Sequence, residues 1–457
     1  MTLDVPVLTA EEWQARVPRR RFSLPDLRGP VLARLGKAVG RDVPDALSGV
    51  EEIIRQVRDE GDVALRRLTL SLDGAAPDPL ELPRAEWQRA GDKLTAKQRD
   101  AIVTAAVRIE EFHSLQRPKV LGEGELILRP EPLRRVGIYV PGGRARYPST
   151  VLMNAIPARI AGVSEILMVT PPAADGSISP AVLYAAKVAG VSRIFRVGGA
   201  QAIAALAYGT ESIPAVDKIT GPGNVFVVLA KRAVFGVVGI DSLAGPSEIL
   251  VVADASANAE QVVADMASQL EHDPQAWAVL LTDSPELAER VAHDLSRDEL
   301  ASRFGADAAE LHAAAVVVPD IATAIHLAAE FAPEHLALLV EDARSHLLNV
   351  RGAGMIFTGQ WSPVPMGDYV AGSNHTLPTG GAARFASPLG VHDFYRWTTV
   401  VSLKPSTARQ VAPVGIEFAK IEGLVAHQRS LEVLLRRIDA HNAPPAPDRG
   451  AAVDGSS

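Results

Sequence analysis

A glutamine and a histidine three residues apart, Gln269 and His272, close a run of helical spacing over residues 258–270. Residues three apart lie on one face of a helix, so the two side chains can point into the same cleft. An amide oxygen beside an imidazole can hold a metal ion or a polar substrate. The alternative is an ordinary helix end, where such side chains are solvated or cap the last carbonyl groups.

An acid and an imidazole stand side by side further along the chain, at Glu334 and His335. They follow Pro333 and precede an apolar run over 336–340 that predicts a strand, so both lie at the end of an element. A carboxyl group beside an imidazole suits water activation and proton transfer near neutral pH. The alternative is a glutamate beside a structural histidine whose hydrogen bonds are satisfied.

The chain contains no cysteine, so a metal site would need oxygen and nitrogen ligands. Gln269, His272, Asp368 and His427 would form such a set, and neutral imidazoles suit zinc. His427 belongs to the C-terminal helical region, so it could come from a neighbouring subunit. The lack of cysteine also excludes disulfides and any reaction through a thiol nucleophile.

Three glycine-rich turns follow predicted strands in the middle of the chain, at residues 141–143, 198–199 and 221–223. In open α/β sheets, ligands bind beyond the carboxyl ends of the strands, where helix N-termini present N–H groups to anions. The polar side chains of Tyr139, Gln201 and Asn224 stand at equivalent edges, so the turns could line one crevice. None matches the G-x-G-x-x-G fingerprint, and the alternative is that glycine only lets each strand turn into a helix.

Two series of alternating strands and helices must position these residues. In the first, strands are predicted at 136–140, 166–169, 194–197 and 218–220, with helices at 150–161, 181–189, 201–208 and 224–235. In the second, strands are predicted at 249–252, 278–281, 316–318, 336–340 and 355–357, with helices at 258–270, 285–295 and 321–331. This alternation predicts an α/β fold with two doubly wound, incomplete Rossmann-like parallel-sheet modules and small N-terminal and C-terminal helical extensions.

The bulk composition narrows the class of protein. The 457 residues carry a net charge of −8, which argues against a nucleic-acid-binding role. The first residues lack the pattern of a secretion signal, and no apolar run reaches the ~18 residues that a membrane span needs. We therefore expect a cytoplasmic protein that binds no membrane.

Several long motifs resemble those of the histidinol dehydrogenase family and occur in the expected order between about residues 45 and 437. They are GIYVPGG at 137–143, YPSTVLMNAIPA at 147–158, VGGAQAIAALAYGTE at 197–211, AGPSE at 244–248, SQLEHD at 268–273, APEHL at 332–336, GDY at 367–369, SNHTLPTGG at 373–381 and EGLVAH at 422–427.

This resemblance implies a homodimeric, NAD-linked enzyme with one zinc ion per subunit, which oxidises L-histidinol through L-histidinaldehyde to L-histidine. It assigns zinc to Gln269, His272, Asp368 and His427, with His427 supplied by the partner subunit, and acid–base catalysis to Glu334 and His335. Substrate contacts would be made by the zinc ligands and His335 together with Ser247, His375 and Glu422. NAD would contact Tyr139, Gln201 and Asn224.

The expected organisation has five parts. They are an N-terminal arm at 1–35, an α/β module of 36–135 plus 249–388 with most metal and catalytic residues, an NAD-binding α/β module at 136–248, a C-terminal helical extension at 389–441 that donates to the partner subunit, and a disordered tail at 442–457.

Two other classes of protein are compatible with parts of this pattern. A metal-dependent hydrolase could use the same Gln/His/Asp set, with the glycine turns holding a phosphate; it would produce no NADH from NAD and histidinol. A binding protein with two α/β lobes could clamp a ligand without catalysis. The acid–base pair and the absent signal peptide argue against that second class.

Overall fold

The computed structural model describes residues 3–17, 29–75, 77–142, 146–272, 275–299 and 312–441. It divides into two compact units, which are unit 1, Met1–Pro118 with Pro132–Arg396, and unit 2, Lys119–Glu131 with Trp397–Ser457. The predicted disordered tail at 442–457 lies outside the described residues. Among the described helices, none is both long and apolar enough to cross a membrane.

The first sheet of unit 1 has five parallel strands in the order β5-β4-β3-β6-β7. The strands are β3 (Arg135–Tyr139), β4 (Glu165–Thr170), β5 (Arg193–Arg196), β6 (Lys218–Thr220) and β7 (Gly239–Ile240). The helices between them are α7 (Pro148–Ala161), α8 (Pro180–Ala189), α9 (Gly199–Tyr208) and α10 (Val225–Val234). Each predicted strand and helix of the first series is present, within a few residues of its expected ends.

Alternate residues of these strands enter two different cores, because successive side chains point to opposite faces of a sheet. Leu167 and Val169 of β4 pack with α9 and α10, whereas Ile166 and Met168 pack with α7 and α8. Both faces are therefore covered by helices, as a parallel sheet requires.

The second sheet has six parallel strands in the order β1-β10-β9-β8-β11-β12. The strands are β1 (Val7–Thr9), β8 (Glu248–Ala253), β9 (Trp277–Thr282), β10 (Ala313–Val317), β11 (His335–Leu339) and β12 (Met355–Thr358). Its helices are α1 (Ala10–Arg16), α11 (Ala259–Leu270), α12 (Pro285–Arg297), α14 (Ile321–Phe331), α15 (Ala343–His346) and α16 (Val364–Tyr369). Apart from β1 at one edge, its strand order is that of the first sheet.

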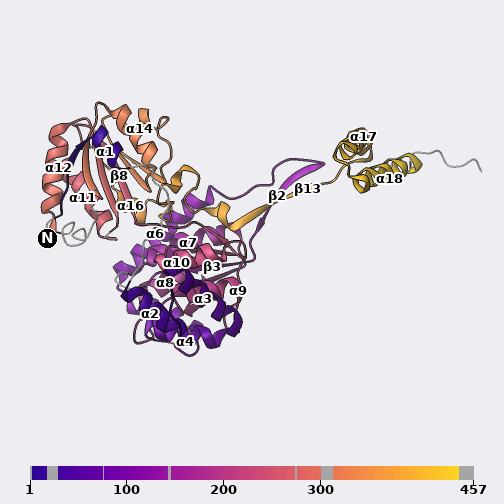
Figure 1. Cartoon of the computed structure of the whole chain (residues 1–457), viewed down its shortest axis with the longest axis horizontal. Helices are drawn as coiled ribbons and strands as arrows, with labels where there is room; N and C mark the ends of the chain where they lie inside the picture. Colours follow the sequence, from indigo (N-terminus) through magenta and orange to yellow (C-terminus); the bar gives the residue numbers. More distant parts are fainter. Residues whose placement is uncertain are drawn as a thin grey trace, which may run out of the picture. The chain divides into compact units, whose positions relative to one another are not determined.

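The helices that precede the first sheet belong to it, which corrects the expected grouping of 36–135 with 249–388. They are α2 (Pro30–Val39), α3 (Ala46–Glu60), α4 (Asp62–Asp73), α5 (Arg84–Gln88) and α6 (Ala96–Ser114). Their apolar faces share two cores with β3, β4 and β5, and α3 and α4 pack beside α9, as Figure 1 also shows. Helix α3 ends and helix α4 begins at Gly61, which has a φ of 58°.

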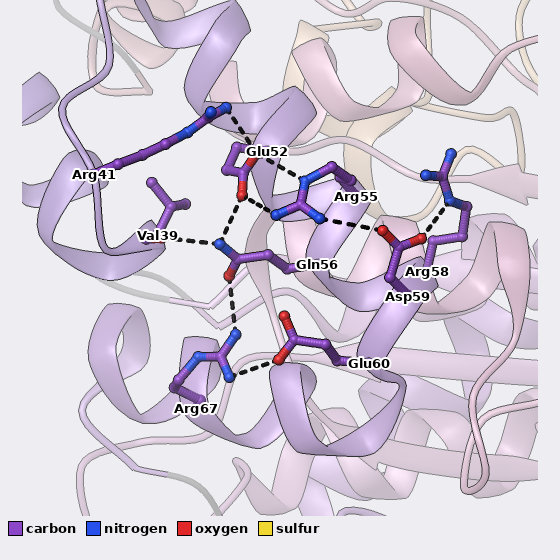
Figure 2. A network of polar contacts seen from close by, with 9 residues as sticks. All are labelled: Val39, Arg41, Glu52, Arg55, Gln56, Arg58, Asp59, Glu60 and Arg67. Atoms are coloured by element: carbon purple, nitrogen blue, oxygen red, sulfur yellow. Dashed lines mark hydrogen bonds and ion pairs between the residues drawn. The ribbon is translucent and has the colours of Figure 1, made fainter.

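A charged network on α3 joins these N-terminal helices (Figure 2). The carboxylate of Glu52 accepts hydrogen bonds from Arg55 at 2.6 Å and Gln56 at 2.9 Å, and pairs with Arg41 at 2.7 Å. Gln56 in turn accepts a bond from Arg67 of α4 at 3.0 Å. The arginine hydrogen bonds lower the pKa of Glu52 from 4.5 to about 2, although burial opposes the shift.

Part of the expected N-terminal arm at 1–35 belongs to the second sheet. Residues 7–9 form β1 and pair with β10, and α1 follows at once. Thr9 begins α1 with a capping box, since its hydroxyl accepts from the N–H of Glu12 while the Glu12 carboxylate accepts from that of Thr9. Trp13 is buried against Trp277 and Phe331.

Unit 2 contains the strands β2 (Leu126–Pro132) and β13 (Tyr395–Val401), which pair, and the helices α17 (Pro405–Glu422) and α18 (Val425–His441). The predicted extension at 389–441 therefore starts too early, because Leu389, Val391 and Phe394 are buried in a core of unit 1. The helical part of the predicted extension is two helices, separated by Gly423 at a φ of 73°. Gly415 lets α17 approach Leu431 of α18 closely, since a Cβ there would lie 2.7 Å from the leucine side chain.

Candidate active site

The last turn of α11 carries a buried amide that has no partner. Gln269 is 0 % exposed, and neither its side-chain oxygen nor its nitrogen has a hydrogen-bond partner among the described residues. His272 follows the helix end and is exposed, and its Nδ1 lies 3.3 Å from the hydroxyl of Ser247. A buried unpaired amide is costly, which marks Gln269 as a residue that a ligand would satisfy.

His335 is held in one tautomer at the first position of β11. Its Nδ1 lies 3.0 Å from the carbonyl oxygen of Glu248, and a carbonyl only accepts, so Nδ1 carries the proton. The unprotonated Nε2 has no hydrogen-bond partner among the described residues and lies 3.8 Å from a carboxylate oxygen of Asp368. Burial lowers the pKa of His335 to about 4, with smaller contributions from His272 and His375. The imidazole is therefore neutral at pH 7 and offers a free lone pair at Nε2.

Glu334 lies beside that imidazole, at the turn from α14 into β11. Its carboxyl Oε2 accepts the N–H of Glu248 at 2.9 Å and lies 3.6 Å from Nδ1 of His335. Burial raises the pKa of Glu334 well above its usual value, and the charges of Glu248 and Asp368 raise it further. The turn is strained, because Ala332 has a φ of 54°, the only positive φ among the described residues other than glycine.

The Gly/Pro-rich segment over 359–388 brings two more predicted residues to this place. Burial raises the pKa of Asp368, in α16, to about 7. His375 lies 3.1 Å from the carbonyl oxygen of Asp368 through Nδ1 and 3.4 Å from the hydroxyl of Thr150 through Nε2. The neighbouring Asn374 donates to the carbonyl of Met153 at 2.6 Å. These bonds fix the long segment against α7.

The position of the site suits a cation. Each strand of a parallel sheet starts at one edge, the amino edge, and the helices that run back along the sheet end there. Residues 334–335 and Ser247 lie at the starts of β11 and β8, and Gln269 lies at the end of α11, so the site is at the amino edge of the second sheet. Helix C-termini carry partial negative charge, which favours cations. No group of three or more His, Asp or Glu residues close enough to hold a metal occurs among the described residues.

A second polar cluster lies at the opposite, carboxyl edge of the first sheet. Tyr139 ends β3 and its hydroxyl accepts the N–H of Gly199 at 3.1 Å. Gln201 is 0 % exposed; its nitrogen donates to Asp73 at 3.1 Å, while its oxygen has no partner among the described residues. Burial raises the pKa of Asp73 to about 6, opposed by hydrogen bonds from the Gly198 N–H and from Gln201 and by the charge of Arg34.

The turn after β6 is built differently. Asp241 accepts the N–H of Gly221 at 2.8 Å and pairs with the buried Lys231, which also donates to the carbonyl of Gly221 at 3.1 Å. Asn224 is exposed, and its side-chain oxygen caps α10 by accepting from the N–H groups of Phe226 and Val227. Its oxygen thus has a structural role in the cap.

The predicted site residues therefore fall into three groups. Within unit 1, one group gathers at the amino edge of the second sheet, comprising Ser247, Gln269, His272, Glu334, His335, Asp368 and His375. Tyr139, Gln201 and Asn224 lie at the carboxyl edge of the first sheet. Glu422 and His427 belong to unit 2, where both are exposed near the junction of α17 and α18.

Residue-by-residue reading of the sequence missed two acids, the buried Glu248 and the partly buried Asp73. Glu248 lies within the AGPSE motif and contacts both Glu334 and His335. A charged residue at the start of a wholly apolar strand was the available signal for it. Asp73 ends α4 just before Gly74, and nothing in the local sequence connects it to Gln201, which is 128 positions away.

Comparison with known proteins identifies the family. Residues 38–435 match the family model of histidinol dehydrogenase. A histidinol dehydrogenase of Dehalococcoides mccartyi (strain CBDB1) is 46% identical over 442 residues, covering 94% of this chain and 98% of that protein. One from Prochlorococcus marinus is 45% identical over 412 residues, covering 88% of this chain and 94% of that protein. The crystal structure of histidinol dehydrogenase from Elizabethkingia anophelis matches with a TM-score of 0.85 at 31% identity, covering 96% of this chain and 99% of that chain. The chain, an α/β protein with two parallel sheets, belongs to the histidinol dehydrogenase family.

Proposed function

We propose that this member of the family oxidises L-histidinol through L-histidinaldehyde to L-histidine, with NAD as the hydride acceptor and zinc as the bound metal. The observation that carries this proposal is the pairing of a neutral His335, whose Nε2 is free, with the buried acid Glu334. A base for an alcohol proton and a second base for water are the two proton acceptors that oxidation of an alcohol to an acid requires.

We assign the zinc ion, one per subunit, to Gln269, His272 and Asp368, completed by His427 of the partner subunit. Three observations fit a cation here: the buried amide of Gln269 lacks a partner, α11 ends beside it, and burial disfavours the negative charge of Asp368. The set has oxygen and nitrogen atoms only, which zinc accepts. Zinc, when bound, supplies a Lewis acid that fixes the imidazole and amino nitrogens of the substrate.

We assign NAD to the carboxyl edge of the first sheet, with contacts from Tyr139, Gln201 and Asn224. The free oxygen of Gln201 and the exposed side chain of Asn224 are the groups that a dinucleotide would use. The start of α9 behind Gly198 lacks a side-chain cap. NAD, when bound, accepts the hydride of each oxidation step.

His335 acts in the first oxidation. The hydroxyl proton of the substrate passes to Nε2 while the hydride leaves the adjacent carbon. The bond from Nδ1 to the carbonyl of Glu248 holds the ring in the tautomer that makes Nε2 the base. The product of this step is the aldehyde, with one proton and one hydride removed.

Glu334 acts in the second half of the reaction. Its carboxylate takes a proton from water and the water oxygen adds to the aldehyde carbon, while the aldehyde oxygen takes the proton that His335 gained in the first step. The hydrate forms, and His335 is again a base. His335 then takes a hydroxyl proton of the hydrate as the second hydride leaves, which gives the acid. The raised pKa of Glu334 makes its ionised form a stronger base than an exposed glutamate. With no cysteine in the chain, a thiohemiacetal is not available as an alternative intermediate.

Around these groups, we assign substrate contacts to Ser247, His375 and Glu422, the last from the partner subunit. The bonds of His375 to Asp368 and Thr150 fix its ring, and Ser247 lies within 3.3 Å of His272. These residues would orient the substrate between the two proton acceptors.

A homodimer is part of this proposal. Unit 2 exposes large apolar side chains on its helices, among them Val414 at 58 %, Phe418 at 61 % and Ile421 at 81 % exposure. Such a surface favours burial against a second copy of the chain. It lies on the same helical hairpin as Glu422 and His427.

The direct test is NADH formation from NAD with L-histidinol or L-histidinaldehyde. We expect both substrates to yield NADH, a zinc chelator to abolish the activity, and added zinc to restore it. A metal-dependent hydrolase would form no NADH, and the family match does not favour that alternative. Activity that survives complete removal of zinc would refute the assignment of the metal.

A further inference from the structure

Glu248 is the buried acid that the proposed chemistry leaves without a role. It is the first residue of β8 and is 0 % exposed. In the sheet, β8 lies directly beside β11, with Ile249 opposite His335. Residue 248 is therefore next to both proposed proton acceptors.

The side chain and the N–H of Glu248 hold Glu334 through a reciprocal pair of bonds. The N–H of Glu248 donates to Oε2 of Glu334 at 2.9 Å, and the N–H of Glu334 donates to Oε2 of Glu248 at 3.3 Å. The second of these hydrogen bonds is accepted by a side-chain oxygen of Glu248, so it depends on the acid at position 248. The first bond holds the carboxyl group of Glu334, and the second holds the backbone of Glu334 at its turn.

The other oxygen of Glu248 holds the Gly/Pro-rich segment. Oε1 accepts the N–H of Gly380 at 2.8 Å, and the preceding Thr379 accepts the N–H of Gly245 just upstream of β8. Gly380 has a φ of 63°. One carboxylate therefore joins the turn at Glu334 to the segment that carries His375.

We propose that Glu248 is a positioning residue for the hydration of the aldehyde: it acts through Glu334 and contacts neither substrate nor cofactor. This inference rests on the role of Glu334 proposed above. The bonds that the backbone of residue 248 makes, to the ring of His335 and to the carboxyl group of Glu334, survive any substitution of the side chain. The bond to the N–H of Glu334 requires the side chain of Glu248, so its loss should shift Glu334 at its turn and leave the ring of His335 bonded. A change at Glu248 should therefore separate the two halves of the reaction.

Glu248→Gln is the sharpest variant. A glutamine has one acceptor oxygen and one NH2 donor, so it cannot accept from both Glu334 and Gly380. We expect the kcat for L-histidinaldehyde oxidation to fall about 10- to 100-fold, within the range for misplaced acid–base groups. The kcat for L-histidinol oxidation and the KM values for substrate and NAD should change less than about threefold, since the first-step base stays in place.

The double variant separates positioning from general structural damage. If Glu248 acts through Glu334, adding Glu248→Gln to Glu334→Gln should slow aldehyde oxidation no further than Glu334→Gln alone. Glu52→Gln is the matched control, because Glu52 is a buried acid of the same unit at 4 % exposure that lies in the α3 network. It should leave both half-reactions unchanged in the folded enzyme.

Several results would overturn the inference. They are an unchanged aldehyde step in Glu248→Gln, equal loss in both steps, or additive losses in the double variant. If Glu248→Gln does not fold, Glu248→Asp replaces it: the shorter acid keeps the charge but cannot reach both N–H groups, and wild-type aldehyde oxidation would then refute positioning. A wild-type enzyme that makes no NADH from either substrate would instead refute the proposed function.

Discussion

The two sheets of unit 1 share one strand order, since β5-β4-β3-β6-β7 of the first corresponds to β10-β9-β8-β11-β12 of the second. Their polar clusters nevertheless lie at opposite edges. In the first sheet, Tyr139 and Gln201 lie where strands end and helices begin; in the second, Glu334 and His335 lie where helices end and strands begin. The two edges differ in electrostatics, because helix N-termini favour anions and C-termini favour cations. One topology thus provides an edge suited to a dinucleotide and another suited to a metal-bound, proton-accepting centre.

The largest effect should come from the amino edge of the second sheet. His335→Asn keeps a donor for the carbonyl of Glu248 but lacks the base at Nε2. We expect the kcat of both oxidation steps to fall about 10²- to 10⁴-fold, the usual contribution of a general base. Steady-state NADH formation measures this, with His326→Asn, on the exposed face of α14, as the unaffected control. A loss below about tenfold would remove His335 from the chemistry.

Zinc affinity tests the cation character of the same edge. Gln269→Ala removes the unpartnered amide, and we expect zinc affinity to fall at least about 100-fold, beyond the usual effect of an outer-shell change. The NAD dissociation constant should stay the same, because Gln269 belongs to α11 of the second sheet and the proposed NAD contacts belong to the first. Equilibrium dialysis with metal analysis and an NAD titration measure the two quantities.

Mixed dimers extend this test to the proposed shared site. His427→Asn should also lose zinc. A dimer that combines a Gln269→Ala chain with a His427→Asn chain should regain one intact site. Both substitutions then fall in one of the two sites, and the other site keeps its wild-type Gln269 and His427. No recovery of zinc or activity in the mixed dimer would show that each site is built within one subunit.

The reciprocal variant at the first sheet should have a smaller effect. Gln201→Leu keeps the volume but removes the free amide oxygen, and we expect the KM for NAD to rise about tenfold through loss of a hydrogen bond. Zinc content should be unchanged. If Gln201→Leu alters zinc binding, or if Gln269→Ala weakens NAD binding, the division between the two edges fails.

The smallest effect concerns stability away from both edges, in the α3 network of Figure 2. The folded-state pKa of Glu52, about 2, is below its ordinary value of 4.5. Its stabilisation is therefore present above pH 4.5 and lost as the pH falls toward 2. We expect Glu52→Gln to lower the free energy of unfolding by about 1 kcal/mol at pH 7, because Arg41 and Arg55 are half exposed and screened. Urea titrations at pH 7 and pH 3 measure it; a difference that does not shrink at pH 3 would contradict the linkage.

The sequence predicted most elements of both sheets, since β-branched runs, helical spacing and glycine turns are local signals. It missed β1 and the packing of α2–α4, which depend on contacts between residues far apart in the chain. For the site, spacing identified Gln269–His272 and Glu334–His335. No local pattern contains the pairing of β8 with β11. That pairing sets the tautomer of His335 and the part played by Glu248, and it helps to bring the site residues together.

The central claim is that His335 serves both oxidation steps whereas Glu334 serves only the hydration of the aldehyde, and NADH stoichiometry tests it most directly. Limiting L-histidinol with excess NAD should give two NADH per histidinol with the wild-type enzyme. With Glu334→Gln, we expect a fast phase of one NADH, then accumulation of L-histidinaldehyde and a second phase about 10²- to 10⁴-fold slower. Two NADH formed at the wild-type rate, or equal slowing of both phases, would contradict the account.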